Sequence, residues 1–408
     1  MEPNLILMAI PGFIVLIGVE AVYCHRKGLP YYRLHDTISD LSMGVASQVM
    51  GGVLTLISLG IYGWIYEHFR VVTLDSQSPL TWILAILGYD LAYYWLHRMS
   101  HTLNLLWGGH APHHQSEDYN LAVALRQGSF QGFLTTAFYW PLALLGFHPL
   151  VTLTVGQINT IYQFWIHTRT VKQLGYLELF LNTPSHHRVH HGKNPKYLDK
   201  NHAGMFIIWD KLFGTFVPEE EEPVYGVIDP LRSWNPVWGH FKFYLTLARA
   251  AWNSEQRLWN LLRIWFMPAG WVPPHGVPKY APDQESPAFR AKYETHLPSS
   301  MNHYVLLHFT VVLLGAVGYL VGKNSLQTWE NLAIAGILIW GLLNLGGIME
   351  RRAWAWKAEL WRLILVPLFF GYWSGMGALA GLAILGASSL AWIGTSGSLF
   401  VTRADPAR

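Results

Sequence analysis

Residues 94–114 read YWLHRMSHTLNLLWGGHAPHH, and five of these 21 residues are histidines. The stretch begins where a mainly apolar run, Leu80–Leu96, is ending, and that run is close to the length of about 20 residues with which a helix crosses a membrane. Positions i and i+4 lie on one face of a helix, so His97 and His101 can bind one metal ion side by side. The stretch therefore predicts a metal site at the end of a membrane helix.

Further histidines lie downstream, and two groups share the spacing H-x-x-H-H. In a helix this spacing brings positions i, i+3 and i+4 together, although Pro112 disturbs the first of these helices unless it lies in the first turn. A lone histidine at a membrane boundary is usually an interfacial side chain, but the repeated spacing favours metal binding. The predicted ligands are nine histidines in four clusters: His97, His101, His110, His113, His114, His167, His187, His190 and His191.

The residue types narrow the metal chemistry. The single cysteine, Cys24, excludes disulfide frameworks, cysteine zinc sites and iron–sulfur clusters. Zinc takes four or fewer protein ligands, so nine imidazoles suit two ions, and Arg98 stands where the zinc-hydrolase motif HExxH needs glutamate. Affinity alone would favour copper. Iron is favoured by reactivity, because two neighbouring iron ions can activate O2 against a lipid C–H bond. Bis-histidine haem and a histidine-rich membrane protein that binds or transports metal are the alternatives.

The composition indicates an integral membrane protein. Hydrophobic residues make up 51% of the 408 residues, charged residues make up 13%, and the mean hydropathy is +0.22. Soluble domains carry about 25% charged residues, so a disordered chain is excluded and a wholly soluble one is disfavoured. The net charge of +3 is too small to indicate nucleic-acid binding. Nine spans are predicted: Asn4–Cys24, Leu41–Tyr66, Leu80–Leu96, Phe130–Phe147, Pro149–Ile166, His303–Gly322, Trp329–Met349, Leu363–Gly381 and Leu382–Val401.

We predict an all-α, polytopic fold in which a histidine-rich helical cap covers a transmembrane bundle. The spans Phe130–Phe147 and Pro149–Ile166 are joined too tightly for an exposed loop, so they are expected to form a membrane hairpin over 130–166. With the N-terminus outside, 26 of the 28 Lys and Arg residues fall in segments that face the cytoplasm, and only Arg70 and Lys323 do not. The histidines then lie on the cytoplasmic side of a bacterial inner membrane or of the endoplasmic reticulum.

This layout predicts three parts. Residues 1–96 hold the N-terminal transmembrane helices, 97–302 form the catalytic region with the hairpin and the cap, and 303–408 form a C-terminal transmembrane bundle. Small residues in the last part, such as Gly346 and Gly347, permit close helix packing. The acidic run 219–222 is expected to form a solvated turn.

The histidine boxes resemble those of the fatty acid hydroxylase/sterol desaturase superfamily of integral-membrane, oxygen-dependent di-iron enzymes. The resemblance covers about residues 80–230 and is most specific for the alkylglycerol monooxygenase branch. The similar stretches are SEDYNL at 116–121, ALRQ at 124–127, YQFWIHT at 162–168, LNTPSHHRVHHG at 181–192, DKN at 199–201 and IWDKLFGTF at 208–216.

The resemblance implies a reaction, its cofactors and its partners. Alkylglycerol monooxygenases use O2 and tetrahydrobiopterin to hydroxylate the ether-linked carbon of an O-alkyl glycerol lipid, and the hemiacetal then collapses to a fatty aldehyde and free glycerol. Carried over, the nine histidines would bind two iron ions, and the lipid substrate would come from the bilayer. Electrons would come from an external donor, a pterin or a separate reductase, because no cytochrome b5, nucleotide-fold or ferredoxin motif is found. A fatty acyl or sterol hydroxylase or desaturase of the same superfamily is the alternative.

Beyond the ligands no catalytic side chain is predicted, but some residues are expected to bind the metal or to orient its ligands. Asp90, two turns before His97, is expected to accept a hydrogen bond from a histidine ring, with an ion pair to Arg98 as the alternative. Gln163 stands at the first position of an H-x-x-x-H pair that the hydroxylase relatives often show. The residues expected to bind the metal or to orient its ligands are His186, His202, Asp90, Gln163, Glu117, Asp118 and Asp199. The alternative for the last three is that they are only solvated.

Overall fold

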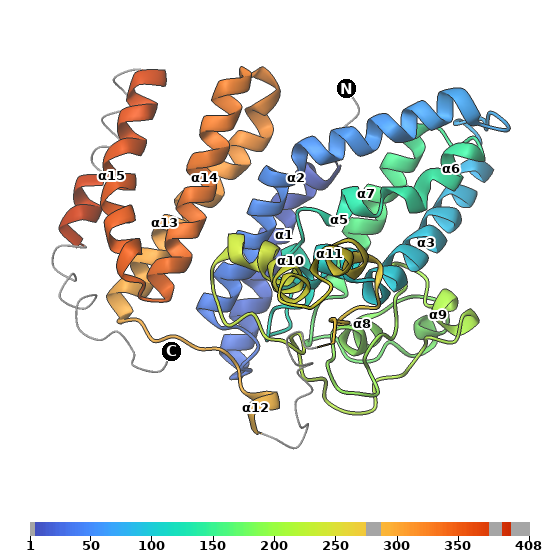
Figure 1. Ribbon diagram of the computed structural model, residues 1–408, viewed down its shortest axis with the longest axis horizontal. Coiled ribbons are helices and arrows are strands. Elements are labelled where there is room, and N and C mark those ends of the chain that lie inside the picture. The colour runs from blue at the N-terminus through green and yellow to red at the C-terminus, as the bar shows by residue number, and fades with distance from the viewer. Residues whose placement is uncertain (1–4, 275–286, 375–385, 393–408) are drawn as a thin grey trace. The chain divides into compact units, whose positions relative to one another are not determined.

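The computed structural model describes residues 5–274, 287–374 and 386–392. Within these ranges the chain is helical and holds no strand beyond isolated bridges, which confirms the predicted all-α fold (Figure 1). The first elements are α1 (Leu5–Lys27), α2 (Leu34–Phe69), α3 (Pro79–Thr102), α4 (Asn104–His114), η1 (Val123–Leu125), α5 (Gln131–Leu134), η2 (Thr136–Tyr139), α6 (Trp140–Leu144) and α7 (Pro149–Trp165). They are followed by η3 (Gly175–Leu179), α8 (Pro184–His190), α9 (Ile208–Leu212), α10 (Pro236–Trp252), α11 (Arg257–Arg263), η4 (Ile264–Phe266), α12 (Pro287–Arg290), α13 (Ser299–Gly322), η5 (Lys323–Ser325), α14 (Thr328–Met349) and α15 (Ala353–Ser374).

The chain divides into two compact units. The first consists of residues 1–231 and 239–292, and the second of 232–238 and 293–408. The first unit contains both the predicted N-terminal helices and all the histidine boxes. The three-part division of the sequence stays a prediction.

The core of the first unit holds the helices whose ends carry the histidines. Helices α2, α3, α6 and α7 pack around buried side chains that include Tyr62, Ala85, Leu142 and Val151 (Figure 1). The Tyr62 hydroxyl lies 3.0 Å from the carbonyl oxygen of Phe147 and 2.7 Å from the Thr152 hydroxyl. This buried polar group is therefore satisfied inside an otherwise apolar core.

Several helices are suited to a membrane, so the chain is a membrane protein. By length and apolar composition the described residues contain three such helices: α1, Ser299–Ser325 and α14. A fourth span results if Leu34–Gly52 and Leu54–Phe69, which are bent by 51° within α2, count as one. Helix α7 has 17 residues and is about 26 Å long, which is less than the roughly 30 Å of a hydrocarbon core. Hydropathy alone thus predicts more full spans than the described helices provide.

The first limb of the predicted hairpin, 130–147, is not one helix. It is divided into α5, η2 and α6, and Thr135 leaves the helical region with φ −105° and ψ 1°. At its end Gly146 has φ +88°, and a Cβ there would lie 2.0 Å from the carbonyl oxygen of Val72. This close approach requires glycine and sets the turn into α7. Of the last two predicted spans, 375–385 and 393–401 lie outside the described residues.

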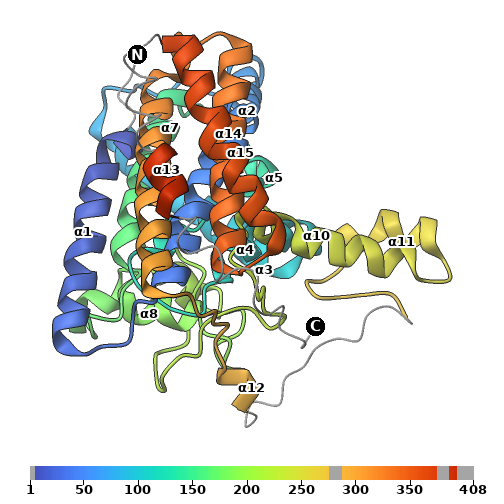
Figure 2. The same ribbon diagram turned by 90° about the vertical axis from the view of Figure 1, so that its left-hand side faces the viewer.

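The second unit packs α13, α14 and α15 together (Figure 2). A Cβ on Gly347 would lie 2.7 Å from the Trp354 ring, so the small residue permits the close packing that its type predicts. The buried carboxylate of Glu359 accepts hydrogen bonds from the Arg362 guanidinium at 2.8 and 2.6 Å and from the side chain of Asn344. An ion pair inside a helical bundle persists only when it is satisfied in this way.

Candidate metal centre

The first two histidine boxes lie on α3 and α4, which a one-residue break separates. Leu103 is extended, with φ −110° and ψ 134°. The buried side chain of Asn104 stabilises the break, because it donates to the carbonyl of Ile264 at 2.9 Å and accepts from the Gly270 N–H at 2.8 Å. Helix α4 continues through Pro112 to its end, so the proline removes one N–H without breaking the helix. The predicted helix therefore forms, but only His110 and His114, at i and i+4, join one group of facing nitrogens, while His113 at i+3 joins another.

Two groups of buried histidines each bring their ligand nitrogens within 4.8 Å of one another. The first group takes residues from α3, α4 and α8: His97, His101, His110, His114 and His190. The second group takes residues from α4, from the end of α7 and from α8 with its C-cap: His113, His167, His187 and His191. All nine predicted ligands thus lie in one group or the other.

Spacings inside the first group match those of ligands around one ion. The Nε2 atom of His110 lies 2.9 Å from Nε2 of His97 and 3.0 Å from Nε2 of His114. Two nitrogens that each bind one ion at about 2.1 Å, at right angles to each other, are about 3.0 Å apart. The three rings therefore present their nitrogens to a common point.

The second group repeats this geometry and shares a wall with the first. The Nε2 atom of His167 lies 3.2 Å from Nε2 of His113 and 3.0 Å from Nε2 of His187. Between the groups, the rings of His114 and His191 stack with their centroids 4.3 Å apart. The two groups are thus neighbours, as a two-metal site requires.

Backbone carbonyls fix the orientation of four of the rings. A carbonyl only accepts hydrogen bonds, so Nδ1 carries the proton and Nε2 keeps the lone pair that can bind a metal. On His101 and His190 the buried Nε2 has no hydrogen-bond partner among the described residues, which is the state of a ligand atom. The four carbonyl contacts are His97 to His202 at 2.8 Å, His113 to Arg126 at 2.8 Å, His167 to Gln163 at 2.7 Å and His190 to Lys200 at 2.9 Å.

Burial keeps these imidazoles neutral. It lowers the pKa of His113 to about 4. It also lowers the pKa of His187, His190 and His191 well below the ordinary value, with the neighbouring histidines as the second cause. Neutral imidazole is the form that binds metal, so each group fits a metal ion at neutral pH.

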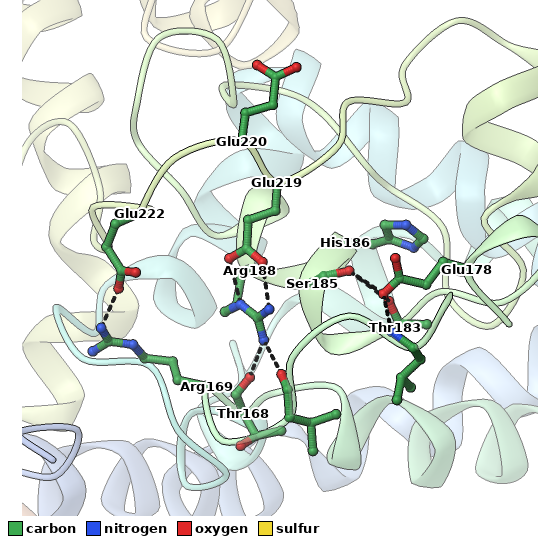
Figure 3. Close-up of polar contacts among 12 residues, drawn as sticks. Thr168, Arg169, Glu178, Thr183, Ser185, His186, Arg188, Glu219, Glu220 and Glu222 are labelled. Carbon is green, nitrogen blue, oxygen red and sulfur yellow. Dashed lines mark hydrogen bonds and ion pairs between the residues drawn. The ribbon is translucent and has the colours of Figure 1, made fainter. Parts of the chain in front are cut away.

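Helix α8 carries His187 and His190 and ends at the C-cap residue His191, and Arg188 anchors it. Its guanidinium contacts both carboxylate oxygens of Glu219, at 2.7 and 2.6 Å, and donates to the carbonyls of Thr168 at 3.0 Å and Val171 at 2.7 Å (Figure 3). Because Thr168 directly follows His167, this one side chain ties the third box to the ligand at the end of α7. A two-pronged arginine–carboxylate contact is among the stronger polar contacts in proteins.

The expectation of a solvated turn at 219–222 holds for Glu220, Glu221 and Glu222, whose side chains are exposed, whereas the Glu219 side chain is only 18% exposed. Each glutamate also has a partner from another segment. The backbone N–H groups of Glu220 and Glu221 also donate to the Tyr197 hydroxyl at 2.8 Å each. The Glu219 side chain and the backbone of Glu220 and Glu221 therefore attach the run to the cap, while the other side-chain pairs are exposed. The four pairs are Glu219 with Arg188, Glu220 with Lys196, Glu221 with Asn194 and Glu222 with Arg169.

Two of the residues that were expected to bind the metal or to orient its ligands lie against the first group. The Asp199 carboxylate is 3.3 Å from Nδ1 of His101 and so orients this ring. Its backbone is left-handed, with φ 56°. His202 supplies the carbonyl that holds His97, while its own Nε2 lies 3.1 Å from the carbonyl of Asp199. His202 is outside both groups and contributes through its backbone.

His186 and Gln163 also lie outside the two groups. His186 of α8 lies beside Glu178 of η3 (Figure 3) and belongs to neither group of facing nitrogens. The side-chain oxygen of Gln163 accepts from the Tyr93 hydroxyl at 2.8 Å, and its carbonyl accepts from His167. Gln163 thus holds a ligand through its backbone.

The expectations for Asp90 are wrong, since it contacts neither a histidine nor Arg98. A separation of seven residues places it about 10 Å along the helix axis from His97, beyond hydrogen-bond reach. It fixes instead the segment that follows His202. Its donors are the N–H groups of Met205 at 2.7 Å and Phe206 at 3.0 Å, the Trp209 indole at 3.0 Å and the Asn159 amide at 2.7 Å.

Glu117 and Asp118 lie away from the histidines. Asp118 pairs with Arg33 at 2.9 Å and with Lys292. Glu117 packs beside Gly226. Neither residue belongs to a group that could hold a metal among the described residues.

Sequence reasoning missed two residues that support the centre. The Arg126 carbonyl holds His113, and its buried guanidinium lies 3.1 Å from the Asp40 carboxylate. Arg126 belongs to the ALRQ stretch at 124–127, whose resemblance to the family could have indicated its role. Glu20 of α1 is buried and accepts from the hydroxyl of Thr168. An acidic residue inside an apolar span is expected to be functional, so the rule that applies to Asp90 also pointed to Glu20.

Known proteins are similar in sequence to this chain over most of its length. A model of the fatty acid hydroxylase family matches residues 82–215, the region that contains all nine histidines. The alkylglycerol monooxygenase of Danio rerio is 40% identical over 377 residues, which cover 91% of this chain and 83% of the relative. The alkylglycerol monooxygenase of Homo sapiens is 37% identical over 374 residues with the same coverage. The chain belongs to the alkylglycerol monooxygenase family.

Membership of the alkylglycerol monooxygenase family makes the chain an oxidoreductase and confirms the resemblance noted from the sequence. Other lipid-modifying relatives match a shorter part. The ornithine lipid hydroxylase OlsE of Rhizobium tropici is 31% identical over 158 residues, which cover 37% of this chain and 45% of the relative. No solved structure matches the chain.

Proposed function

We propose that the chain is a membrane-bound, non-haem di-iron monooxygenase that uses O2 to hydroxylate the ether-linked carbon of an O-alkyl glycerol lipid. The observation that carries the proposal is the pair of adjacent histidine groups, in which Nε2 atoms face each other at 2.9–3.2 Å. Relatives that are named for this activity are 37–40% identical over most of the chain.

The two iron ions, when bound, would supply the activation of O2 towards a C–H bond. The protein's own contribution is to hold the ligands in one tautomer and to keep water away. Trp107 covers the first group, with its ring centroid 4.9 Å from that of His101. Tyr119 is fully buried over the second group, 5.7 Å from His167 and 5.1 Å from His191. These aromatic rings make the site dry.

The lipid and the electrons would both come from outside the chain. An alkyl chain in the bilayer would present its ether carbon to the metal groups, and the hydroxylated product is a hemiacetal that collapses to aldehyde and glycerol. A tetrahydropterin or a separate reductase would supply the electrons.

The proposal is tested with purified full-length protein and an alkylglycerol, O2 and tetrahydrobiopterin. We expect a fatty aldehyde, and no aldehyde from the His113→Ala variant. His25→Ala, which removes an exposed histidine outside both groups, is the matched control and should retain activity. Product from a sterol or a fatty acyl lipid instead would assign the chain to the alternative substrates.

We also propose that the histidine groups face the cytoplasm, which the distribution of Lys and Arg supports. In a Cys24→Ser background, the single substitutions Lys172→Cys and Asn324→Cys should place their thiols on opposite sides of the membrane. A thiol reagent that does not cross membranes should label only the cysteine at Asn324 in intact cells. Labelling of the cysteine at Lys172 alone would reverse the orientation.

A further inference from the structure

Residues 239–266 carry apolar side chains that the first unit leaves exposed. This segment comprises α10 from Gly239 onward, α11 and η4, and Figure 2 shows it extending sideways, across the direction of α1. Leu258, Leu262 and Phe266 are 72, 67 and 69% exposed. The four-residue spacing of Leu258 and Leu262 places them on one face of α11, and Phe266 extends the exposed apolar stripe at the end of η4. A continuous exposed apolar stripe marks an interaction surface.

Arginines accompany the stripe. Arg249 and Arg257 are exposed, and Arg263 is partly exposed. The guanidinium of Arg257 lies 5.3 Å from the Trp252 ring centre, and that of Arg263 lies 4.9 Å from the Trp271 ring centre. None of the three arginines forms an ion pair with a carboxylate in the part of the chain that the structure describes. Exposed leucine and tryptophan combined with arginine are typical of helices that lie in the interfacial layer of a membrane.

An apolar groove continues this surface onto α4. It has a volume of about 380 Å³ and is lined by Leu105, Phe241, Tyr244, Trp265 and Phe266. The only side-chain polar groups in this lining are the Tyr244 hydroxyl and the Trp265 indole, and the hydroxyl donates to the carbonyl of Leu105 at 3.1 Å. Such a lining suits a hydrocarbon chain.

The groove does not lead to the first of the metal groups. Around α4, Leu105 lies about 180° from His114 and about 140° from His110 of the first group, and about 80° from His113 of the second. On the groove side, a Cβ on Gly108 would lie 2.4 Å from the Tyr244 ring, so α10 packs directly on the back of the metal-bearing helix. A chain in the groove is separated from the first group by α4, and we assign it to a bound lipid.

We propose that residues 239–266 lie in the interfacial layer of an anionic bilayer. The apolar stripe is immersed at the acyl boundary, the arginines bind lipid phosphates, and the groove holds one acyl chain. The contact of Tyr244 with Gly108 then holds α4 at a fixed depth relative to the lipid surface. This contact with lipid does not depend on the reaction proposed above.

Quenching of single labels tests the immersion. The full chain in a Cys24→Ser background carries one cysteine at Leu258, at Leu262 or at the exposed polar control Gln256, each with an environment-sensitive fluorophore, in nanodiscs of phosphatidylcholine and phosphatidylglycerol. We expect lipid-borne nitroxides to quench the labels at Leu258 and Leu262 several-fold more than the label at Gln256, and aqueous iodide to do the reverse. Equal iodide quenching at all three positions overturns the proposal. Shielding that persists in lipid-free detergent together with a dimeric mass also overturns it, because a second copy then covers the stripe.

Charge reversal tests the lipid chemistry. In the Leu258→Cys protein, the ratio of quenching by spin-labelled phosphatidylglycerol to quenching by spin-labelled phosphatidylcholine measures local enrichment of anionic lipid. We expect Arg249→Glu and Arg257→Glu each to lower this ratio by about fivefold or more. Lys172→Glu, the same charge change at another exposed site, should leave the ratio unchanged. Arginine variants that behave like Lys172→Glu contradict the assignment of the arginines to lipid phosphates.

Discussion

Replacing Arg126 with alanine is expected to destabilise the first unit by about 3–5 kcal/mol. The Arg126 side chain is 2% exposed and pairs with the buried carboxylate of Asp40 at 3.1 Å. Without it that carboxylate is a buried, unpaired charge, and the Pro112 carbonyl and the Gln115 side chain lose donors at 2.7 and 2.8 Å. Replacing both charges, with Arg126→Leu and Asp40→Leu, should recover most of the loss, because the cost comes mainly from the isolated charge.

The only cysteine provides the assay. Cys24 is 1% exposed, so a thiol-reactive dye reports unfolding as the metal-free protein is heated. At roughly 2 °C per kcal/mol, Arg126→Ala should lower Tm by about 6–10 °C. Lys172→Ala is the control, since Lys172 is exposed and forms no ion pair among the described residues, so its loss should change stability by less than about 0.5 kcal/mol. If the two variants melt within a degree of each other, the buried pair is not the support that the geometry indicates.

Three further predictions use the same melt. Glu20→Ala removes the acceptor of the Leu121 N–H and the Thr168 hydroxyl and should cost about 2–4 kcal/mol; a neutral result would show that α1 is held otherwise. Asp90→Ala leaves two buried N–H groups without an acceptor and should cost about 2–5 kcal/mol while activity per folded molecule falls; unchanged stability refutes the assigned contacts. The pKa of His113 is about 4 in the folded chain and about 6.5 in the unfolded chain. The contribution of this residue to the free energy of unfolding is therefore present above pH 6.5 and is lost as pH falls towards 4. The metal-free protein should therefore lose about 2 kcal/mol through this residue between pH 8 and pH 5, and a flat Tm over this range contradicts the neutral, buried state.

Local periodicity made much of the centre predictable. Histidines at i and i+4 share a helix face wherever a helix forms, so the boxes predicted the pairs His97 with His101, His110 with His114 and His187 with His191. The structure places all nine in two groups, while their binding of iron stays a prediction. The length of the apolar runs predicted most of the long helices in the same way, but not the division of 130–147 into α5, η2 and α6.

Long-range packing decided what the spacing could not. His113 and His114 are neighbours in sequence but belong to different groups, as do His187 and His190 of one helix, because the partition depends on how α3, α4 and α8 pack. The partners of Asp90 are more than 65 residues away in the sequence. Such contacts leave no periodic trace in the chain.

The two histidine groups are proposed to hold one iron ion each. Elemental analysis of the purified protein counts these ions, and the Cys24 thiol-dye melt verifies that the protein is folded. We expect two iron ions per chain, falling to one when His187→Ala disables the second group alone. Stoichiometric copper, or a folded wild-type protein that retains no metal, would contradict the claim.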